Sequence, residues 1–453
     1  MPVSPARAAA FDILLRVEQR QAYATELLNS ARTAELSPAD RALCMELTMG
    51  VLRWRSRLDF ALAAVVSQRL EKLDVEVLTT LRLAAYQLEF LRVPARAAVH
   101  ESVELVKRAR KRSAAPLVNA ALRKLSAGHE PPVLSPGPKS AVDLSQLYAH
   151  PLWLVERWAG RYGLETAEKI CAHDQQHAPV ALRLRDPAVE DELRREGIRI
   201  EPGALLKSAR RLESAGAAGM ERQKNRKTDR LTELLREGRI AIQDEASQLV
   251  ALLVGRGART LDCCAAPGGK TAILAERNPG ALLVAADIHP HRARLMRELL
   301  GITAPPHVHL LAADATRLPF AAQFDRILAD VPCSGTGTLA RNPEIKWRLK
   351  ADSLAELHAL QVAILRSALA ALAPGGRLVY STCSLEPEEN ERVVEEALAG
   401  GAFHVIPARG ELERMRSELA WPDLDSLCEG PYLRTIPGVH PCDGFFAAIM
   451  EGA

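Results

Sequence analysis

The stretch RTLDCCAAPGGKTAIL (259–274) decides the fold of this chain. An apolar, strand-like run ends at Asp262, a turn of small residues follows, and Gly269 opens a helical pattern. Four later apolar runs also end in Asp or Cys and are separated by helical segments. They are LLVAAD (282–287), VHLLAAD (308–314), FDRILADVPC (324–333) and RLVYSTCS (377–384). Buried strands alternating with helices predict a mostly parallel, doubly wound sheet, in which ligands bind at the carboxyl ends of the strands.

The turn after the first strand suits a nucleoside-bearing cofactor. A P-loop would need glycine where Cys264 stands, and the dinucleotide pattern G-x-G-x-x-G is also missing. Small residues let the backbone approach a ligand closely, and Asp287 and Asp314, at the next two strand ends, suit ribose hydroxyls and an adenine amino group. S-adenosylmethionine fits this set better than NAD; the alternative is that the acids only cap helices. The residues expected at the cofactor are therefore those of the turn 265–271, together with Asp287 and Asp314.

Two cysteines, Cys333 and Cys383, fall at strand ends on the same rim. A single cysteine in an apolar run is usually a core residue, but two at a ligand rim, one of them following Asp330, favour chemistry. Thiols and a carboxyl group suit methylation of cytosine C5, because that carbon reacts only after a thiolate adds to C6. A carboxyl group would stabilise charge on the ring, and a second basic group would remove the C5 proton.

The spacing of apolar residues and the positions of prolines divide the rest of the chain. Helical periodicity up to about residue 125 predicts an all-helical bundle, and four prolines between 126 and 145 indicate a linker. A basic loop is expected at 214–230, and the helix at 352–373 is expected to stop at the glycine pair 375–376. The predicted domains are a helical domain (1–130), a linker (131–145), a small α+β connector (146–240) and a Rossmann-like catalytic domain (241–453).

Charge points to a polyanionic partner. The net charge is only +3, but residues 1–130 carry 20 Lys/Arg against 14 Asp/Glu. The alternative is an ordinary solvated surface. The expected RNA-contacting cations are Lys107, Arg108, Arg110, Lys111, Arg112 and Arg183. The segment 207–230 is also expected to contact RNA phosphates.

Composition excludes several classes. Eight cysteines without a C-x-x-C pair indicate reduced thiols rather than a disulfide scaffold or zinc ribbon. No apolar run is long enough for a membrane helix, and the first residues meet charges too early for a secretory signal. We therefore expect a cytoplasmic protein without a metal or a membrane partner. We also expect a monomer, although composition does not determine the oligomeric state.

Taken together, the motifs resemble those of the Sun/NOL1/NOP2 family of RNA cytosine-C5 methyltransferases. The resemblance covers about 150–450 and rests on LDCCAAPGGKT, AADIHPHR, FDRILADVPCSGTGTLARNPEIKWR, LVYSTCSLEPEENE and the terminal DGFFAA. It implies that Cys383 is the nucleophile, that Cys333 assists proton loss and product release, and that Asp330 contacts the base. It also implies S-adenosylmethionine as the cofactor. The cofactor-binding residues that the resemblance implies are Cys264, Ala265, Ala266, Pro267, Gly268, Gly269, Lys270, Asp287, Asp314 and Asp330. One stretch, 221–238, departs from the family by being rich in Arg and Lys, which leaves the contacts around 207–240 open.

The N-terminal region resembles the RNA-binding fold of the antitermination factor NusB. The similarity rests on LRLAAYQLEFLRVPARAAVHESVELVK and LVNAALRKL. This fusion implies a bacterial branch that methylates one cytosine of 16S rRNA and prefers free RNA to assembled subunits. Three alternatives remain: the same chemistry on another RNA such as tRNA, a non-catalytic antitermination-like module, and an amino-methyltransferase. The last would want an Asn/Asp-Pro-Pro-aromatic strand end, which 330–333 does not provide.

Overall fold

The computed structural model describes residues 3–91, 93–128, 139–212, 224–301, 307–320 and 323–452. The chain forms two compact units. One contains Met1–His177 together with Leu339–Arg348, and the other contains Ala178–Thr338 and Leu349–Ala453. Among the described residues, no helix is both long and apolar enough to cross a bilayer.

The first unit is helical throughout its described residues. Its two longest N-terminal helices begin with Ser-Pro, at Ser4 and at Ser37, where proline has the backbone angle that a first helical turn requires. The Ser37 hydroxyl also accepts a hydrogen bond from the Asp40 amide and so caps its helix. The α-helices are α1 (Pro5–Arg20), α2 (Ala24–Leu28), α3 (Ala31–Ala34), α4 (Pro38–Val65), α5 (Val75–Glu89), α6 (Ala95–Arg108), α7 (Ala115–Ser126), α8 (Ala141–Leu147), α9 (Leu152–Tyr162), α10 (Leu164–Asp174) and α16 (Ile345–Arg348).

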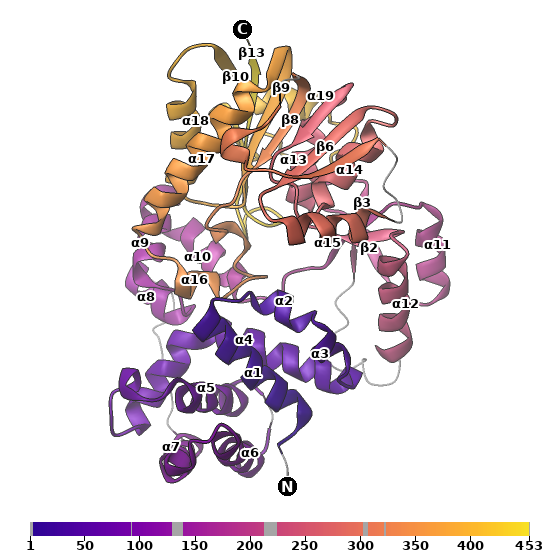
Figure 1. Ribbon diagram of the computed structural model, residues 1–453. Helices are drawn as coiled ribbons and strands as arrows, with labels where there is room; N and C mark the ends of the chain where they lie inside the picture. Colours follow the sequence, from indigo (N-terminus) through magenta and orange to yellow (C-terminus); the bar gives the residue numbers. More distant parts are fainter. Residues whose placement is uncertain are drawn as a thin grey trace. The chain divides into compact units, whose positions relative to one another are not determined.

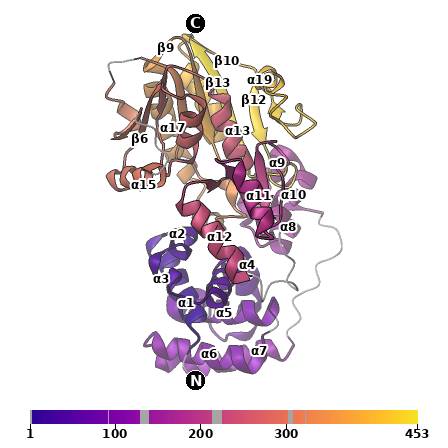
Figure 2. The same cartoon turned by 90° about the vertical axis from the view of Figure 1, so that its right-hand side faces the viewer.

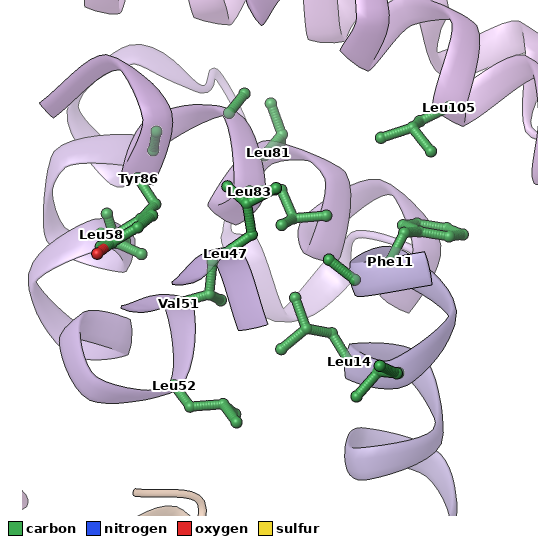
Figure 3. Packing of buried hydrophobic residues seen from close by; sticks show 14 of the residues in the cluster. Phe11, Leu14, Leu47, Val51, Leu52, Leu58, Leu81, Leu83, Tyr86 and Leu105 are labelled. Carbon is green, nitrogen blue, oxygen red and sulfur yellow. The ribbon is translucent and has the colours of Figure 1, made fainter. Parts of the chain in front are cut away.

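One apolar core joins the helices of residues 1–126. Figure 3 shows Phe11 and Leu14 of α1, Leu47 of α4, Leu81 of α5 and Leu105 of α6 within this core. Each of these side chains is at most 5% exposed, and burying one contributes about 1.5–3 kcal/mol. The predicted helical bundle is confirmed.

A segment from the second half of the chain completes the first unit. In sequence, residues 339–348 lie within the catalytic part of the chain, but in the structure they pack with the N-terminal helices. The Trp347 indole Nε1 donates to the Leu52 carbonyl oxygen at 2.6 Å, and the Lys346 Nζ donates to the Arg53 carbonyl oxygen at 3.0 Å. The segment is therefore fixed by hydrogen bonds to the backbone of α4.

Burial of Lys346 predicts a pH dependence of stability. Burial lowers its pKa to about 7, with Arg53 acting in the same direction and Asp174 opposing. The unfolded chain, with an ordinary lysine pKa, holds a proton between pH 7 and 10 that the native chain has released. Raising the pH therefore stabilises the native state, by at most about 1.4 kcal/mol per pH unit. We expect the melting temperature of wild type, relative to Lys346→Met, to rise between pH 7 and pH 9.5 in calorimetry.

The matched control is Lys169→Met, which removes an exposed lysine of the same unit. Its melting temperature relative to wild type should stay constant over that pH range. A difference for Lys346→Met that is equally constant would contradict the lowered pKa.

The second unit begins with a small antiparallel sheet of order β2-β3-β1-β4, which carries two helices. This arrangement confirms the α+β character expected for the connector. Its elements are β1 (Ala181–Leu184), α11 (Ala188–Arg195), β2 (Ile200–Pro202), β3 (Ala209–Leu212), α12 (Lys224–Arg236) and β4 (Ile240–Ile242).

Two irregular segments expected from the sequence are partly helical. Of the predicted basic loop 214–230, residues 214–223 lie outside the described residues, and the remainder belongs to α12. Of the predicted linker 131–145, residues 131–138 lie outside them, and the end begins α8, where the Ser140 hydroxyl caps the helix by accepting from the Asp143 amide. The division into four segments drawn from the sequence stays a prediction. The division by contacts is a different one, with its first boundary after His177.

The larger sheet has the order β11-β12-β13-β9-β8-β5-β6-β7, with β10 paired to β13. Strands β5 to β9 are parallel, and β13 lies antiparallel beside β9 (Figure 2). The doubly wound sheet is confirmed, with an antiparallel C-terminal extension. Its elements are α13 (Glu245–Leu253), β5 (Arg259–Asp262), α14 (Gly269–Arg277), β6 (Leu282–Asp287), α15 (Pro290–Gly301), β7 (Val308–Ala312), β8 (Phe324–Asp330), α17 (Ser353–Ala370), β9 (Leu372–Thr382), α18 (Glu391–Leu398), β10 (Phe403–Ile406), α19 (Ala408–Arg414), β11 (Cys428–Glu429), β12 (Tyr432–Thr435) and β13 (Phe445–Gly452).

Helices cover both faces of this sheet (Figure 1). Alternate strand residues supply the two cores: Leu328 and Val379 pack in the cluster of α13 and α14, whereas Leu378 and Tyr380 pack in the cluster of α17 and α18. One boundary differs from expectation. Helix α17 ends at Ala370 and not at the glycine pair, because β9 already begins with buried Leu372, paired to β8.

Candidate active site

The two candidate cysteines meet at the carboxyl ends of neighbouring strands. Parallel pairing of β8 and β9 aligns Asp330 with Ser381, so that the chain places Cys333 and Cys383 just beyond the sheet. Their sulfur atoms are 3.3 Å apart, although the residues are 50 positions apart in sequence. Both side chains are half-buried. The structure thus brings together the thiols that the sequence placed on one rim.

The surroundings of the two thiols differ. The pKa of Cys333 is raised well above its usual value, first by its hydrogen bond with Cys383 and then by burial and the charge of Cys383. Cys333 therefore keeps its proton, and a hydrogen bond joins its sulfur atom to that of Cys383.

A lysine of the cofactor loop reaches the same site. Lys270 Nζ donates to Asp330 Oδ2 at 2.7 Å, and Ser381 Oγ donates to Asp330 Oδ1 at 2.6 Å. Burial alone would lower the pKa of Lys270, but the Asp330 carboxylate outweighs it, and the charges of Cys383 and Asp262 also help to raise the pKa. A cation thus lies within electrostatic reach of the nucleophile candidate.

The sequence placed Asp330 and Lys270 in the site but missed their ion pair, and it missed Ser381 altogether. The sequence places both residues next to strand ends, but only the structure shows that their strands, β5 and β8, are neighbours.

The expected cofactor loop lies between β5 and α14. Gly268 has a φ of +106°, a conformation that only glycine adopts readily, and α14 begins at the next residue. Asp262, at the end of β5, is buried and accepts a hydrogen bond from Thr271 at 2.7 Å. Burial raises the pKa of Asp262 to about 7. The loop from Cys264 to Lys270 therefore follows a buried, hydrogen-bonded strand end.

The two further acids stand where the sequence expected them. Asp287 ends β6 and accepts from the His289 amide at 2.9 Å; Asp314 follows β7 and accepts from the Thr316 amide at 2.9 Å. Each acid thus caps a turn through its Oδ1 atom, as the alternative interpretation had it. Capping by one oxygen does not occupy the other.

The electrostatics of the loop fit a cationic cofactor. The pKa of Cys264 is raised well above its usual value, first by burial and then by the charges of four carboxylates, Asp262, Asp330, Asp287 and Asp314. Such a concentration of acids produces a negative potential, which complements the sulfonium and ammonium groups of S-adenosylmethionine. The residues present therefore fit this cofactor.

The predicted RNA-contacting cations of the helical unit fall into two groups. Lys107, Arg108 and Lys111 form ion pairs with acids of the same unit. Arg110 and Arg112 are exposed, and neither has an acidic partner among the described residues. These two remain available for phosphate contacts.

Arg183 is not available for that purpose. It lies in β1, is 6% exposed and forms an ion pair with Glu276 of α14, next to Arg185. The prediction that it is a surface contact to RNA is wrong, because the strand turns this side chain against α14.

Comparison with known proteins places the chain among methyltransferases. The family described as 16S rRNA methyltransferase RsmB/F matches residues 250–451, the NusB family matches 4–127, and the ferredoxin-like domain of RsmF/B-like methyltransferases matches 150–218. The chain is 36% identical over 414 residues to the probable ribosomal RNA small subunit methyltransferase B of Bacillus subtilis, which covers 87% of this chain and 88% of that protein.

Two further similarities extend this picture. The ribosomal RNA small subunit methyltransferase B of Vibrio cholerae is 33% identical over 98% of this chain and 97% of its own length. Among solved structures, a methyltransferase homologue from Pyrococcus horikoshii has a TM-score of 0.55 and 26% identity, over 70% of this chain and 100% of that one.

Proposed function

Because the chain belongs to the RsmB/F family of 16S rRNA methyltransferases, which use S-adenosylmethionine, we propose that it methylates C5 of one cytosine in 16S rRNA. The observation that carries the choice of C5 is the 3.3 Å separation of the Cys333 and Cys383 sulfur atoms. Methylation of an amino group needs no covalent bond between the enzyme and the base, so it does not explain why two thiols lie side by side. The monomeric state and the cytoplasmic location stay predictions.

Cys383 is the nucleophile in this mechanism. Its sulfur adds to C6 of the cytosine, and the electron pair of the C5–C6 double bond moves into the ring and makes C5 reactive. The bound cofactor supplies the methyl group for C5. Lys270 and Asp330 form an ion pair beside the carboxyl ends of β5 and β8. In this mechanism the two charged groups stabilise the charge that develops on the ring.

Cys333 then serves the release of the product. When Cys383 is bonded to C6, it no longer carries the charge and the free sulfur that raise the pKa of Cys333. Cys333 can then release its proton to solvent water and, as a thiolate, accept the C5 proton, directly or through a water molecule, while the bond between Cys383 and C6 breaks. The double bond returns, and Cys383 leaves as a thiolate.

The target base must be accessible. C5 and C6 of a cytosine inside a helix cannot meet a side chain, so the base comes from single-stranded RNA or is flipped out. Following what the resemblance of the N-terminal region implies, we propose protein-free 16S rRNA as the substrate rather than the assembled subunit.

The test supplies isotope-labelled S-adenosylmethionine and, separately, protein-free 16S rRNA, assembled small subunits and tRNA, followed by nucleoside analysis. We expect 5-methylcytidine in the free rRNA. The same product in tRNA alone would overturn the substrate, and a different methylated nucleoside would overturn the chemistry. No methylation of any RNA would favour the non-catalytic, antitermination-like alternative.

Arg110 and Arg112, which have no acidic partner among the described residues, predict a salt-dependent contribution to RNA binding. Replacing Arg110 and Arg112 together by alanine should weaken binding and lower the slope of log K against log salt by about one to two, as expected for the loss of two phosphate contacts. Filter binding over a range of salt concentrations measures this. Binding of S-adenosylmethionine should be unchanged and far less sensitive to salt.

Arg69→Ala is the matched control, since Arg69 is exposed in the same unit but paired with Glu71. An equal loss in this variant, or an unchanged slope for the double variant, would remove Arg110 and Arg112 from the RNA-binding surface.

A further inference from the structure

A buried polar cluster lies behind the two cysteines and has no part in the mechanism above. Its centre is Glu389, in the short helical turn after β9, with Asn390 beside it; neither side chain is exposed to solvent. In sequence, the run of acids around 388–391 has the composition of a solvated helix start. In the structure, Glu389 points into the catalytic unit.

Glu389 joins the residues that follow each cysteine. Its Oε1 accepts from the Ser334 amide at 2.7 Å and from Gln361 Nε2 at 3.0 Å. Its Oε2 accepts from the Ser384 hydroxyl at 2.5 Å and from the Ser334 hydroxyl. Ser334 follows Cys333 and Ser384 follows Cys383, so a single carboxylate connects the two loops.

The opposite sides of both cysteines are held as well. Gln361 also donates to the carbonyl oxygen of Pro332, which precedes Cys333, at 2.9 Å. Asn390 accepts from the hydroxyl of Thr382, which precedes Cys383, at 2.5 Å, and it donates to the Ser384 carbonyl oxygen at 2.9 Å. Hydrogen bonds of one cluster therefore fix the chain before and after each thiol.

We propose that Glu389 is a positioning residue, which holds the Cys333 and Cys383 sulfur atoms at the separation that proton transfer between them and the base requires. The inference rests on the proposed function, in which both thiols act. Four donors converge on the two oxygens of Glu389, and a carboxylate is the side chain that accepts without donating. An amide in its place would turn an N–H group toward one of these donors, so Glu389→Gln loosens the connection with almost no change in shape.

The first test needs no RNA. Diamide oxidises two neighbouring thiols to a disulfide and takes up the two protons and two electrons that they release. In the full-length wild type, Cys333 and Cys383 should form this bond readily because their sulfur atoms are in contact. Mass spectrometry of peptides from non-reduced protein follows the reaction. In Glu389→Gln we expect it to be at least about tenfold slower, since small displacements of reacting groups have large effects on rate.

The matched control is Glu245→Gln. Glu245 is also buried in the second unit, and it accepts from the amides of Leu205 and Leu206, but it touches neither cysteine nor their neighbours. In Glu245→Gln, the disulfide between Cys333 and Cys383 should form at the wild-type rate. Ser334→Ala removes one donor, the Ser334 hydroxyl, and leaves Glu389 in place. It should slow disulfide formation relative to wild type, but less than Glu389→Gln does. If Glu389→Gln folds poorly, Ser334→Ala serves as the test variant.

The second test measures turnover. Glu389→Gln should lower kcat by about a hundredfold while the KM for RNA and the affinity for S-adenosylmethionine change little. A wild-type disulfide rate in Glu389→Gln would overturn the inference, as would unchanged kcat. If the disulfide rates differ as expected but the wild type methylates no RNA, the positioning role stands and the proposed function fails.

Discussion

Cys383→Ala is expected to lower the formation of 5-methylcytidine on protein-free 16S rRNA by at least about 10⁴-fold, the order of loss found when a covalent nucleophile is removed. The reason is chemical: without a sulfur atom at C6, cytosine C5 does not become reactive toward a methyl donor. Neither Lys270 nor Asp330 can replace that bond, because both act on charge only. Single-turnover methylation with labelled S-adenosylmethionine measures the loss.

Cys428→Ala is the control for loss of a thiol as such. Cys428 is half-buried in the same unit, and its sulfur atom contacts only the Leu424 carbonyl oxygen among the hydrogen-bond partners described. It should methylate at the wild-type rate. If Cys383→Ala still methylates, the nucleophile assignment is wrong, and Cys333 becomes the candidate.

Cys333→Ala should act at the opposite end of the reaction. It retains the nucleophile but lacks the group that accepts the C5 proton, so turnover should fall by about 10²–10⁴-fold, the usual contribution of a general base. The enzyme should instead accumulate as a covalent complex with methylated RNA. Denaturing electrophoresis shows this complex as a band of reduced mobility that carries label from the cofactor.

The double variant Cys333→Ala with Cys383→Ala provides the control, because it should form no complex. A complex that persists in the double variant would mean that another residue attacks the base. A Cys333→Ala variant that turns over normally without a trapped complex would show that Cys333 does not serve product release.

The parts of the site that lie at or directly after the carboxyl end of a strand could be predicted from sequence. Apolar runs of strand length that end in Asp or Cys place Asp287, Asp330 and Cys383 on one edge of a parallel sheet, because all such strands end on the same side. The small-residue turn before Lys270 is a local signal of the same kind. Fold and cofactor loop therefore follow from short-range patterns.

Contacts between distant segments could not be predicted in this way. The ion pair of Lys270 with Asp330 and the contacts of Glu389 depend on which strands become neighbours. Arg183 illustrates the reverse error, because a cation in a short strand has the same sequence signature whether it faces solvent or α14. Side-chain direction in such cases is set by packing, which composition and periodicity do not record.

The membership of residues 339–348 in the first unit has a consequence for biosynthesis. About 170 residues separate His177 from the end of this segment, and at about 5–20 residues per second the ribosome takes roughly 10–30 s to make them. During that interval the carbonyl oxygens of Leu52 and Arg53 lack the partners that Trp347 and Lys346 later provide. The N-terminal helices therefore reach their final hydrogen bonding only after the strands that carry Asp287 and Asp330 have been synthesised. Completion of the first unit thus depends on residues that the ribosome adds only after strands β5 to β8 of the second unit.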